Sequence, residues 1–367
     1  MIRLSSIINE YEKEFRQKYK KNLLPSHLKA LSAIKICRSS QSPKMLMQCE
    51  NENCMHQRLV PHSCGHRHCP HCQNYETQSW IERQLQKKLP ADYFLLTFTL
   101  PAQFRVLAWL TQRLIYGLLF CCVWETLKVF CLNDKKLGGL PGAIAVLHTH
   151  SRELNYHPHI HIVMPAATID RFKRLWKKKS GKYLFNKEAL AKVFMAKMLN
   201  ALTVNHLQLP INYPKDWVVH CRCVGTGEKA LLYLSRYLYR SVIREKDILT
   251  CENGKITFRY RDSKSKKYLT KTVTAVHFLW LVFQHVLPRG FRRAREYGFL
   301  HTNSKTVIKI LQWMFLLNPD KWIGKLKPRK KMVCECCGAL MKTVATRLSS
   351  FTTLSEQEVE SPKLQPV

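Results

Sequence analysis

Apolar and polar residues follow one another along this chain with two periods, one typical of strands and one typical of helices. Segments rich in aromatic and β-branched residues predict strands at Tyr93–Thr99, Ala143–His150, His159–Met164, Trp217–Cys223, Lys255–Arg261 and Lys267–Thr274. Helices are predicted at Ile2–Lys35 with a break at Pro25, and at Asn74–Lys88, Phe104–Leu132, Ile169–Lys178, Lys187–His206, Glu228–Arg244 and Thr274–Val286. This mixture favours an α+β fold with a central antiparallel sheet flanked by helices.

Histidines stand at alternating positions of one predicted strand, within His157–Pro165. Residues two apart share a face of a strand, so His159 and His161 point the same way while Ile160 and Ile162 pack behind them. A single strand histidine is usually a hydrogen-bonded core residue. Two at this spacing, preceded by a third, instead indicate a two-histidine metal site.

A divalent ion such as Mg²⁺ or Mn²⁺ needs a further ligand, because two imidazoles hold it weakly. His148 and His150 share a face of the preceding strand, and antiparallel pairing would bring either of them beside His159. We prefer His148 as the third ligand. The alternative is a polar residue on the predicted helix Glu228–Arg244.

Two tyrosines lie on one face of that helix. Tyr233 and Tyr237 are four residues apart, which puts one phenol a turn above the other. A phenolate attacks phosphorus when a metal polarises the phosphate, so the pair could carry out two successive strand transfers. Taken alone, aromatic residues at this spacing are more often part of a core.

A dense cysteine and histidine cluster lies between Cys49 and Cys72. Thiolates and imidazoles at such short spacings converge on Zn²⁺, and a segment with so little apolar content does not fold readily without a metal. The preferred zinc ligands are Cys49, Cys54, Cys69 and Cys72. Cys64 could replace one of them, or join His66 or His68 at a second site. The alternative is a loop of reactive thiols.

The charge of the chain is strongly positive. It has 60 lysines and arginines against 25 aspartates and glutamates, a formal net charge of +35. Such an excess predicts a nucleic acid as partner, rather than only a solvated basic surface or a coating role. Arg289–Arg295 is a basic run, and Arg289, Arg292 and Arg293 are candidates for DNA contact. At 46% hydrophobic residues the chain folds around a core.

The cysteine count and the apolar runs bear on compartment. Fifteen cysteines would suit a secreted disulfide scaffold, but Met1–Glu10 lacks the features of a signal peptide. We therefore expect reduced or metal-bound cysteines in a cytoplasmic protein. The most apolar run, Leu114–Trp124, is too short to span a bilayer and predicts a buried helix, so no membrane partner is expected.

Five segments, within residues 30–340, resemble one protein family. They are Leu147–His161, Tyr233–Tyr237, the Cys-Pro-His-Cys signature at Ser63–Gln73, Val286–Gly298 and Cys334–Gly338. In this order they resemble the HUH-endonuclease transposases of rolling-circle insertion sequences, the two-tyrosine class with an N-terminal zinc-binding domain. Two features depart from the family: four residues separate Cys49 from Cys54, and Cys334, Cys336 and Cys337 have no second pair downstream.

The resemblance implies a ferredoxin-like or RRM-like sheet that carries His159 and His161 beside the tyrosine helix. It implies metal-dependent nicking of single-stranded DNA at element ends, by Tyr233 or Tyr237, through a 5′-phosphotyrosine and a free 3′-hydroxyl. Arg236 and Arg240 would hold phosphates, or be simply solvated. Zinc at the N-terminal cysteines and Mg²⁺ or Mn²⁺ at the histidines are the implied metals.

The resemblance divides the chain into a helical and zinc-binding part (1–90), a catalytic domain (91–300) and a C-terminal part (301–367) whose end, from Leu348, is expected to be disordered. It places the protein at the bacterial nucleoid. Two other functions stay open: a non-catalytic zinc-finger DNA-binding regulator, and a relaxase or replication initiator with the same chemistry. Oligomeric state and DNA sequence preference are not predicted.

Overall fold

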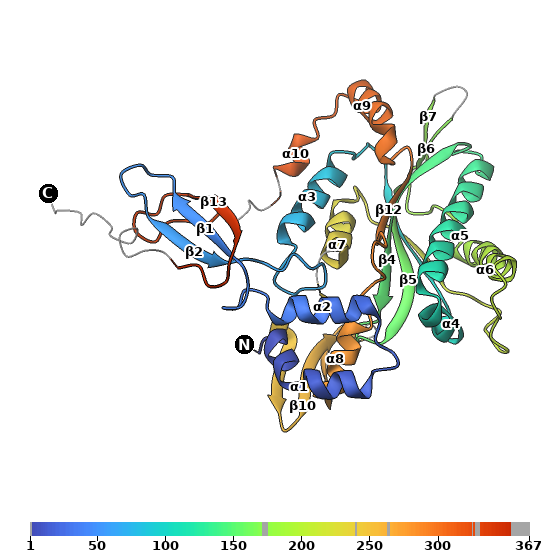
Figure 1. Cartoon of the computed structure of the whole chain (residues 1–367). Helices are drawn as coiled ribbons and strands as arrows, with labels where there is room; N and C mark the ends of the chain where they lie inside the picture. Colours follow the sequence, from blue (N-terminus) through green and yellow to red (C-terminus); the bar gives the residue numbers. More distant parts are fainter. Residues whose placement is uncertain are drawn as a thin grey trace.

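A central antiparallel sheet with helices on both faces dominates the structure, a computed structural model (Figure 1). It describes residues 2–170, 175–238, 241–262, 265–324, 326 and 331–353; of residues 236 and 237 only the backbone is described. The strands are β3 (Tyr93–Thr99), β4 (Leu140–His150), β5 (Tyr156–Pro165), β6 (Ala167–Ile169), β7 (Trp176–Lys178), β8 (Val219–Cys223) and β12 (Ala294–Gly298). Their order is β7-β6-β4-β5-β3-β8, and β12 also pairs with β4. The predicted α+β class with a central antiparallel sheet is confirmed.

The two faces of the sheet differ because successive side chains of β5 point to opposite sides. Ile160 and Ile162 enter a core beneath α4 (Arg105–Leu110), α5 (Gln112–Asn133) and α6 (Lys187–Val204). Val163 faces the other way, toward a core that α3 (Asn74–Leu85), α7 (Glu228–Leu238), α9 (Lys305–Met314) and α10 (Asp320–Ile323) help to form. Figure 1 shows these two groups of helices on opposite sides of the sheet.

Helix α5 is a long, apolar helix. Its length and its mean hydropathy of 1.7 would suit a membrane span, yet half of that window is buried inside the protein. Ile115, Leu119 and Val123 pack into the core under the sheet. The prediction of a buried helix is confirmed, and the helix extends beyond the run Leu114–Trp124 on which it was based.

A helical lobe lies beside the sheet. It is built from α1 (Leu4–Lys18), α2 (Pro25–Lys35) and α8 (Ala275–Phe283), with a second sheet of β9 (Ile248–Glu252), β10 (Lys255–Arg261) and β11 (Tyr268–Thr274). Phe15, Leu31 and Phe278 are fully buried in its core. The predicted break at Pro25 and the β10–β11 hairpin are confirmed, whereas the sequence did not predict β9.

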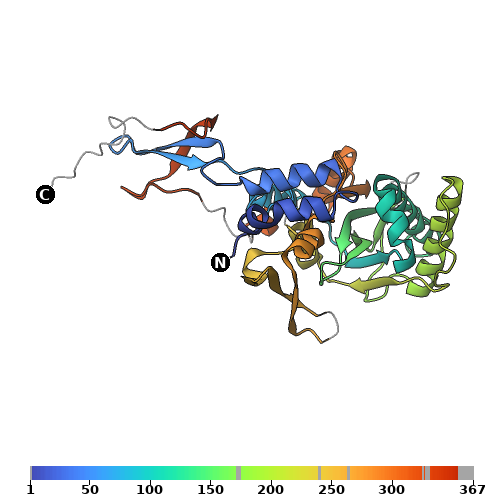
Figure 2. The same ribbon diagram turned by 60° about the horizontal axis from the view of Figure 1, so that its bottom comes forward.

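A third, small sheet stands apart at one end of the molecule (Figures 1 and 2). It consists of β1 (Lys44–Cys49), β2 (Gln57–Pro61) and β13 (Met341–Leu348), in the order β13-β1-β2. Both pairs are antiparallel, and Cys49 lies opposite Met341. An early and a late segment of the chain thus form one sheet. The domain boundaries at residues 90 and 300 stay a prediction, and residues 354–367 of the expected tail lie outside the described part.

Two predicted helices differ from the structure. Ile169–Lys178 was expected to be helical, but Ala167–Ile169 and Trp176–Lys178 pair as strands at the edge of β4, where the open backbone groups of that edge offer hydrogen bonds. A helix was expected over Glu228–Arg244. The structure describes α7 over Glu228–Leu238, whereas residues 241–244 are not helical and Glu245–Asp247 forms a 3₁₀ turn. The Glu245 carboxylate accepts a hydrogen bond from the Leu4 amide at 2.8 Å, which fixes this segment against α1.

Candidate active site and zinc sites

Three imidazoles meet on the face of the central sheet that α7 covers. Strand register brings them together, because His148 of β4 lies directly opposite His159 of β5 and His161 follows two residues later. Each offers one ring nitrogen, and the three nitrogens lie within 4.8 Å of one another. The structure therefore groups His148, rather than His150, with the two histidines of β5. Their role as metal ligands stays a prediction.

Hydrogen bonds fix how two of these rings are oriented. His159 Nδ1 lies 2.7 Å from the His157 carbonyl oxygen, to which it donates. His161 Nδ1 lies 2.8 Å from Thr97 Oγ1, a residue of β3 that pairs with His161. A histidine that uses Nδ1 in this way keeps Nε2 for a metal, and such partners also raise its basicity as a ligand. The arrangement fits a divalent cation.

The environment keeps the three imidazoles neutral. Burial lowers the pKa of His159 to about 4. Burial and the neighbouring imidazoles lower the pKa values of His148 and His161 well below the usual range. Because a metal binds the neutral ring, protons do not compete with a metal for these nitrogens near neutral pH.

Tyr233 lies over this imidazole group. Its ring centroid is 5.8 Å from that of His161 and 6.5 Å from that of His148. The other predicted nucleophile, Tyr237, lies on the next turn of α7, but its side chain is outside the described residues. The same is true of the Arg236 side chain and of the whole of Arg240, so the structure does not describe these phosphate-binding candidates.

Local sequence fixes the start of the tyrosine helix. Gly227 precedes α7 with φ +82°, and a Cβ there would come within 2.6 Å of the Tyr93 ring. Glycine is favoured at such a position, where the chain turns tightly against β3. Glu228 then pairs with Lys88 at 2.6 Å, and Leu231 and Leu234 are buried against the sheet. This packing sets Tyr233 above the histidines.

An arginine-lined cleft of about 870 Å³ opens between α3, the end of α7 and β12. The arginines that line it are Arg67, Arg83, Arg113, Arg292, Arg293 and Arg295. Among the described lining residues the one carboxylate belongs to Glu296, which pairs with Lys87 at 2.6 Å. Trp80, Phe291 and Tyr297 also line the cleft, but Trp80 and Phe291 are almost wholly buried. So many arginines around one cleft are typical of a surface that binds the phosphates of a nucleic acid.

The cleft adjoins the imidazole group through β12. The Arg293 carbonyl accepts a hydrogen bond from the Leu147 amide, next to His148, at 2.9 Å. The Arg293 side chain is buried, and burial lowers its pKa to about 10, so it is still a cation at neutral pH. Arg292 is exposed in the cleft, and Arg289, exposed nearby, offers its carbonyl to Arg113. DNA contact by these three residues stays a prediction.

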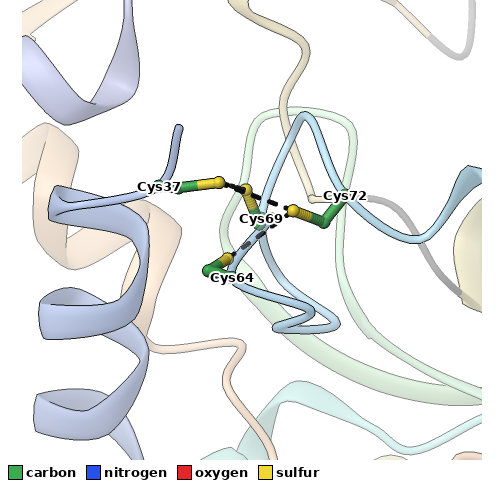
Figure 3. A group of neighbouring side chains, drawn as sticks. All are labelled: Cys37, Cys64, Cys69 and Cys72. Carbon is green, nitrogen blue, oxygen red and sulfur yellow. Dashed lines mark hydrogen bonds between the residues drawn. The ribbon is translucent and has the colours of Figure 1, made fainter. Parts of the chain in front are cut away.

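The cysteines form two separate groups. In the first, the thiols of Cys37, Cys64, Cys69 and Cys72 converge between the end of α2 and the loop before α3 (Figure 3). Neighbouring sulfur atoms lie 3.5 to 3.6 Å apart. A hydrogen bond with Cys64 contributes most to lowering the pKa of the Cys37 thiol, to about 7. Four thiols at these distances can hold Zn²⁺.

The preferred set of Cys49, Cys54, Cys69 and Cys72 is not brought together. Cys49 and Cys54 lie instead with Cys334 and Cys337. The C-terminal cysteines have no second pair after them in the sequence, and this earlier pair takes that place. The sequence reasoning missed Cys37, which stands alone at the end of a helix. Cys37 could have been found by asking which other cysteine completes a four-thiol site with Cys64, Cys69 and Cys72. His66 and His68 pack on each other and join neither group of thiols.

The chain is similar to known transposases. A family model described as "Transposase zinc-binding domain" matches residues 7–100, and one described as "Putative transposase" matches residues 142–307. The "Putative transposase y4qJ" of Sinorhizobium fredii is 28% identical over 325 residues, which cover 81% of this chain and 80% of that protein. The "Transposase for insertion sequence element IS801" of Pseudomonas savastanoi pv. phaseolicola is 29% identical over 274 residues, 69% of this chain and 65% of that protein. No solved structure matches the chain.

Proposed function

Because the chain belongs to the transposase family of IS801-type insertion sequences, with a transposase zinc-binding domain, we propose that it nicks single-stranded DNA and transfers strands through tyrosine–DNA bonds. The observation that carries this proposal is the position of the Tyr233 ring, 5.8 Å from the His161 ring, beside three clustered imidazoles. A core tyrosine would need no such neighbours. A nucleophile that attacks a phosphate would need them.

His148, His159 and His161 would hold the divalent cation through one nitrogen each. When bound, that cation draws negative charge from the scissile phosphate and so makes the phosphorus easier to attack. Imidazole nitrogens suit Mn²⁺ and later transition metals better than Mg²⁺, which prefers oxygen ligands. We therefore expect Mn²⁺ to support the reaction better than Mg²⁺.

In the proposed reaction, the Tyr233 oxygen loses its proton and forms a bond to phosphorus, while the bond from phosphorus to the 3′ oxygen breaks. The leaving oxygen takes up a proton, giving a 5′-phosphotyrosine and a free 3′-hydroxyl. Tyr237, one turn along α7, would repeat the step at the second junction. A 3′-hydroxyl that attacks a phosphotyrosine reverses the chemistry on another strand. No nucleotide cofactor is needed, because each step exchanges one phosphoester bond for another, so the energy of the broken bond is conserved in the phosphotyrosine.

The proposed path of the DNA is the arginine-lined cleft. Its cations, the exposed Arg67, Arg83 and Arg292 among them, would neutralise backbone phosphates. Leu238, the residue directly after Tyr237 in α7, also lines this cleft. Reduced thiols and a DNA substrate suit the bacterial cytoplasm as the place of this reaction.

The test is covalent attachment. The purified protein is incubated with single-stranded oligonucleotides that carry the element ends, with Mn²⁺, and the products are separated under denaturing conditions. We expect a protein–DNA adduct that a chelator abolishes and that peptide mass spectrometry maps to Tyr233 or Tyr237. A plasmid-origin oligonucleotide serves as the control that distinguishes a relaxase.

Tyrosine variants decide between an enzyme and a regulator. Tyr233→Phe together with Tyr237→Phe removes both nucleophilic oxygens and should abolish the adduct while DNA still binds in a gel-shift assay, because the phosphate contacts of the basic cleft would supply most of the binding energy. Tyr268→Phe, an exposed tyrosine of β11, is the matched control. Wild-type protein that binds DNA but forms no adduct with any metal would support the regulator instead.

A further inference from the structure

We propose that the chain holds a second structural zinc ion, bound by Cys49 and Cys54 from the early part of the chain and by Cys334 and Cys337 from its end. The first pair lies inside the matched zinc-binding domain, residues 7–100. The second pair lies beyond both family matches, the later of which ends at residue 307. The site is therefore split between segments some 280 residues apart.

The sulfur distances fit a zinc ion and not a disulfide. Cys49 Sγ lies 3.5 Å from Cys337 Sγ, and Cys54 Sγ lies 3.7 Å from Cys334 Sγ. Zinc–sulfur bonds of about 2.3 Å in a tetrahedron put the sulfur atoms about 3.8 Å apart. A disulfide would need about 2.05 Å. All four donor atoms lie within 4.8 Å of one another.

Each pair of thiols sits on a tight turn that presents it to the other. The Asn51 amide donates to Cys49 Sγ and the Cys336 amide donates to Cys334 Sγ, both at 3.4 Å. Amides that point at sulfur stabilise the thiolate form that a metal requires. Gly338, with φ +71°, closes the second turn through a hydrogen bond to the Cys334 carbonyl. In both turns, the amide two residues after the first cysteine thus donates to its sulfur.

The small sheet around these thiols has too little core to hold itself together. Its buried apolar residues are Met47 and Met341, beside the thiols of Cys49 and Cys334. A three-stranded sheet with so few buried side chains needs a metal or another crosslink for stability. The pairing of β1 with β13 and the four thiols therefore support each other. The metal would stabilise the small sheet, and the register of the strands would place the thiols around the metal.

Cys336 distinguishes this arrangement from a patch of reactive thiols. It is exposed between two members of the group, yet it is not one of the four convergent thiols. The proposed ion thus ties the chain end to the N-terminal part, across the whole catalytic domain.

The experiment measures zinc per chain in the purified full-length protein by inductively coupled plasma mass spectrometry. Cys334→Ser with Cys337→Ser should lose one zinc equivalent, and Cys49→Ser with Cys54→Ser should also lose one. The variant with all four changes should lose one, not two, because both pairs serve the same ion. Cys336→Ser is the matched control and should keep the full zinc content. A loss of two equivalents in the fourfold variant, or of none in the Cys334/Cys337 variant, would overturn the proposal.

Alkylation of the unmodified protein, followed residue by residue by mass spectrometry, tests the same site without a variant that has to fold. Cys49, Cys54, Cys334 and Cys337 should resist the reagent while Cys336 reacts, and a chelator should expose the four together. If Cys334 and Cys337 react as fast as Cys336 before the chelator is added, the site does not exist. Neither readout depends on DNA nicking, so a failure of the proposed function would leave this result unaffected.

Discussion

The imidazole group and the cysteine groups are both clusters of metal-ligand side chains, but they are built in opposite ways. His148, His159 and His161 come from two adjacent strands joined by a short turn, and strand register alone brings them together. Cys49 and Cys337 meet across 288 residues of sequence. The histidine site forms as part of a sheet that has its own core. The second cysteine site forms only when two segments far apart in sequence pack together.

This difference predicts different dependence on metal. The sheet that carries the histidines has apolar cores on both faces, so its shape does not require an ion. The group of Cys49, Cys54, Cys334 and Cys337 lies in a small sheet with few buried side chains, where metal binding would supply much of the folding energy. The Cys37 group fastens a loop to a lobe that has a core of its own. Metal loss should therefore stop chemistry at the histidines and unfold structure at the cysteines. The four predictions below test that contrast.

The largest effect is expected from Cys37→Ser. Cys37 is the thiol that links α2 to the loop of Cys64, Cys69 and Cys72, so its loss should release one zinc ion and loosen the helical lobe. Structural zinc contributes about 10 kcal/mol or more in small domains, and losing one of four ligands removes a large share of it. Zinc analysis and limited proteolysis of residues 1–72 measure the result.

Cys121→Ser is the control for this change, because Cys121 is an exposed thiol on α5 outside both groups. It should keep both the zinc and the resistance to protease. If Cys37→Ser also kept its zinc and its stability, the lobe would be held by packing alone, and the contrast between the two kinds of site would disappear.

The next largest effect is expected from His161→Ala, which should reduce adduct formation by about a thousandfold. A metal ion stabilises the charge that develops on the phosphate by several kcal/mol, and each 1.36 kcal/mol corresponds to about a factor of ten in rate. The zinc content and the thermal unfolding transition of the cysteine regions should not change. His157→Gln is the control, because the His157 ring contacts Arg105 and is not in the group. Equal loss in both variants would point to general damage to β5.

These outcomes bear on what a sequence can reveal. The period-two histidines, the strand that carries them and the pairing with the preceding strand could be predicted because they follow from local geometry. The start of the tyrosine helix could be predicted too. The non-helical segment at residues 241–244 could not, because it leads to Glu245, which accepts a hydrogen bond from the Leu4 amide 241 residues away. Cysteine spacing predicted that zinc binds near Cys69. It could not predict which thiols share an ion, because tertiary structure decides that pairing.

A smaller effect is expected from Thr97→Val, which preserves shape and removes the hydroxyl beside His161 Nδ1. Loss of such a partner in the outer shell of a metal site costs about 10- to 100-fold in metal affinity or activity. The Mn²⁺ concentration needed for half-maximal adduct formation should rise by this factor, and saturating Mn²⁺ should restore much of the yield. Thr99→Val, on the same strand and two residues on, is the control. An unchanged Mn²⁺ requirement would mean that the hydroxyl does not orient the ring.

The smallest effect is expected from His27→Leu, and only in acid. Burial lowers the pKa of His27 to about 4, the same value as for His159, yet His27 belongs to no ligand group. Between pH 6.5 and 4 the unfolded chain binds a proton that the folded chain excludes, so this histidine lowers the free energy of unfolding as the pH falls. From pH 7 to pH 5, His27 lowers the free energy of unfolding by about 2 kcal/mol. Over this range, urea titrations of the Leu variant should therefore show a fall in the free energy of unfolding that is about 2 kcal/mol smaller than in the wild type. Adduct formation at pH 7 should stay unchanged. A low imidazole pKa shows that a histidine is buried, whereas a metal site also requires several ligand atoms close together, which His27 lacks among the described residues. A variant with unaltered acid sensitivity would show that His27 is not the group that takes up the proton.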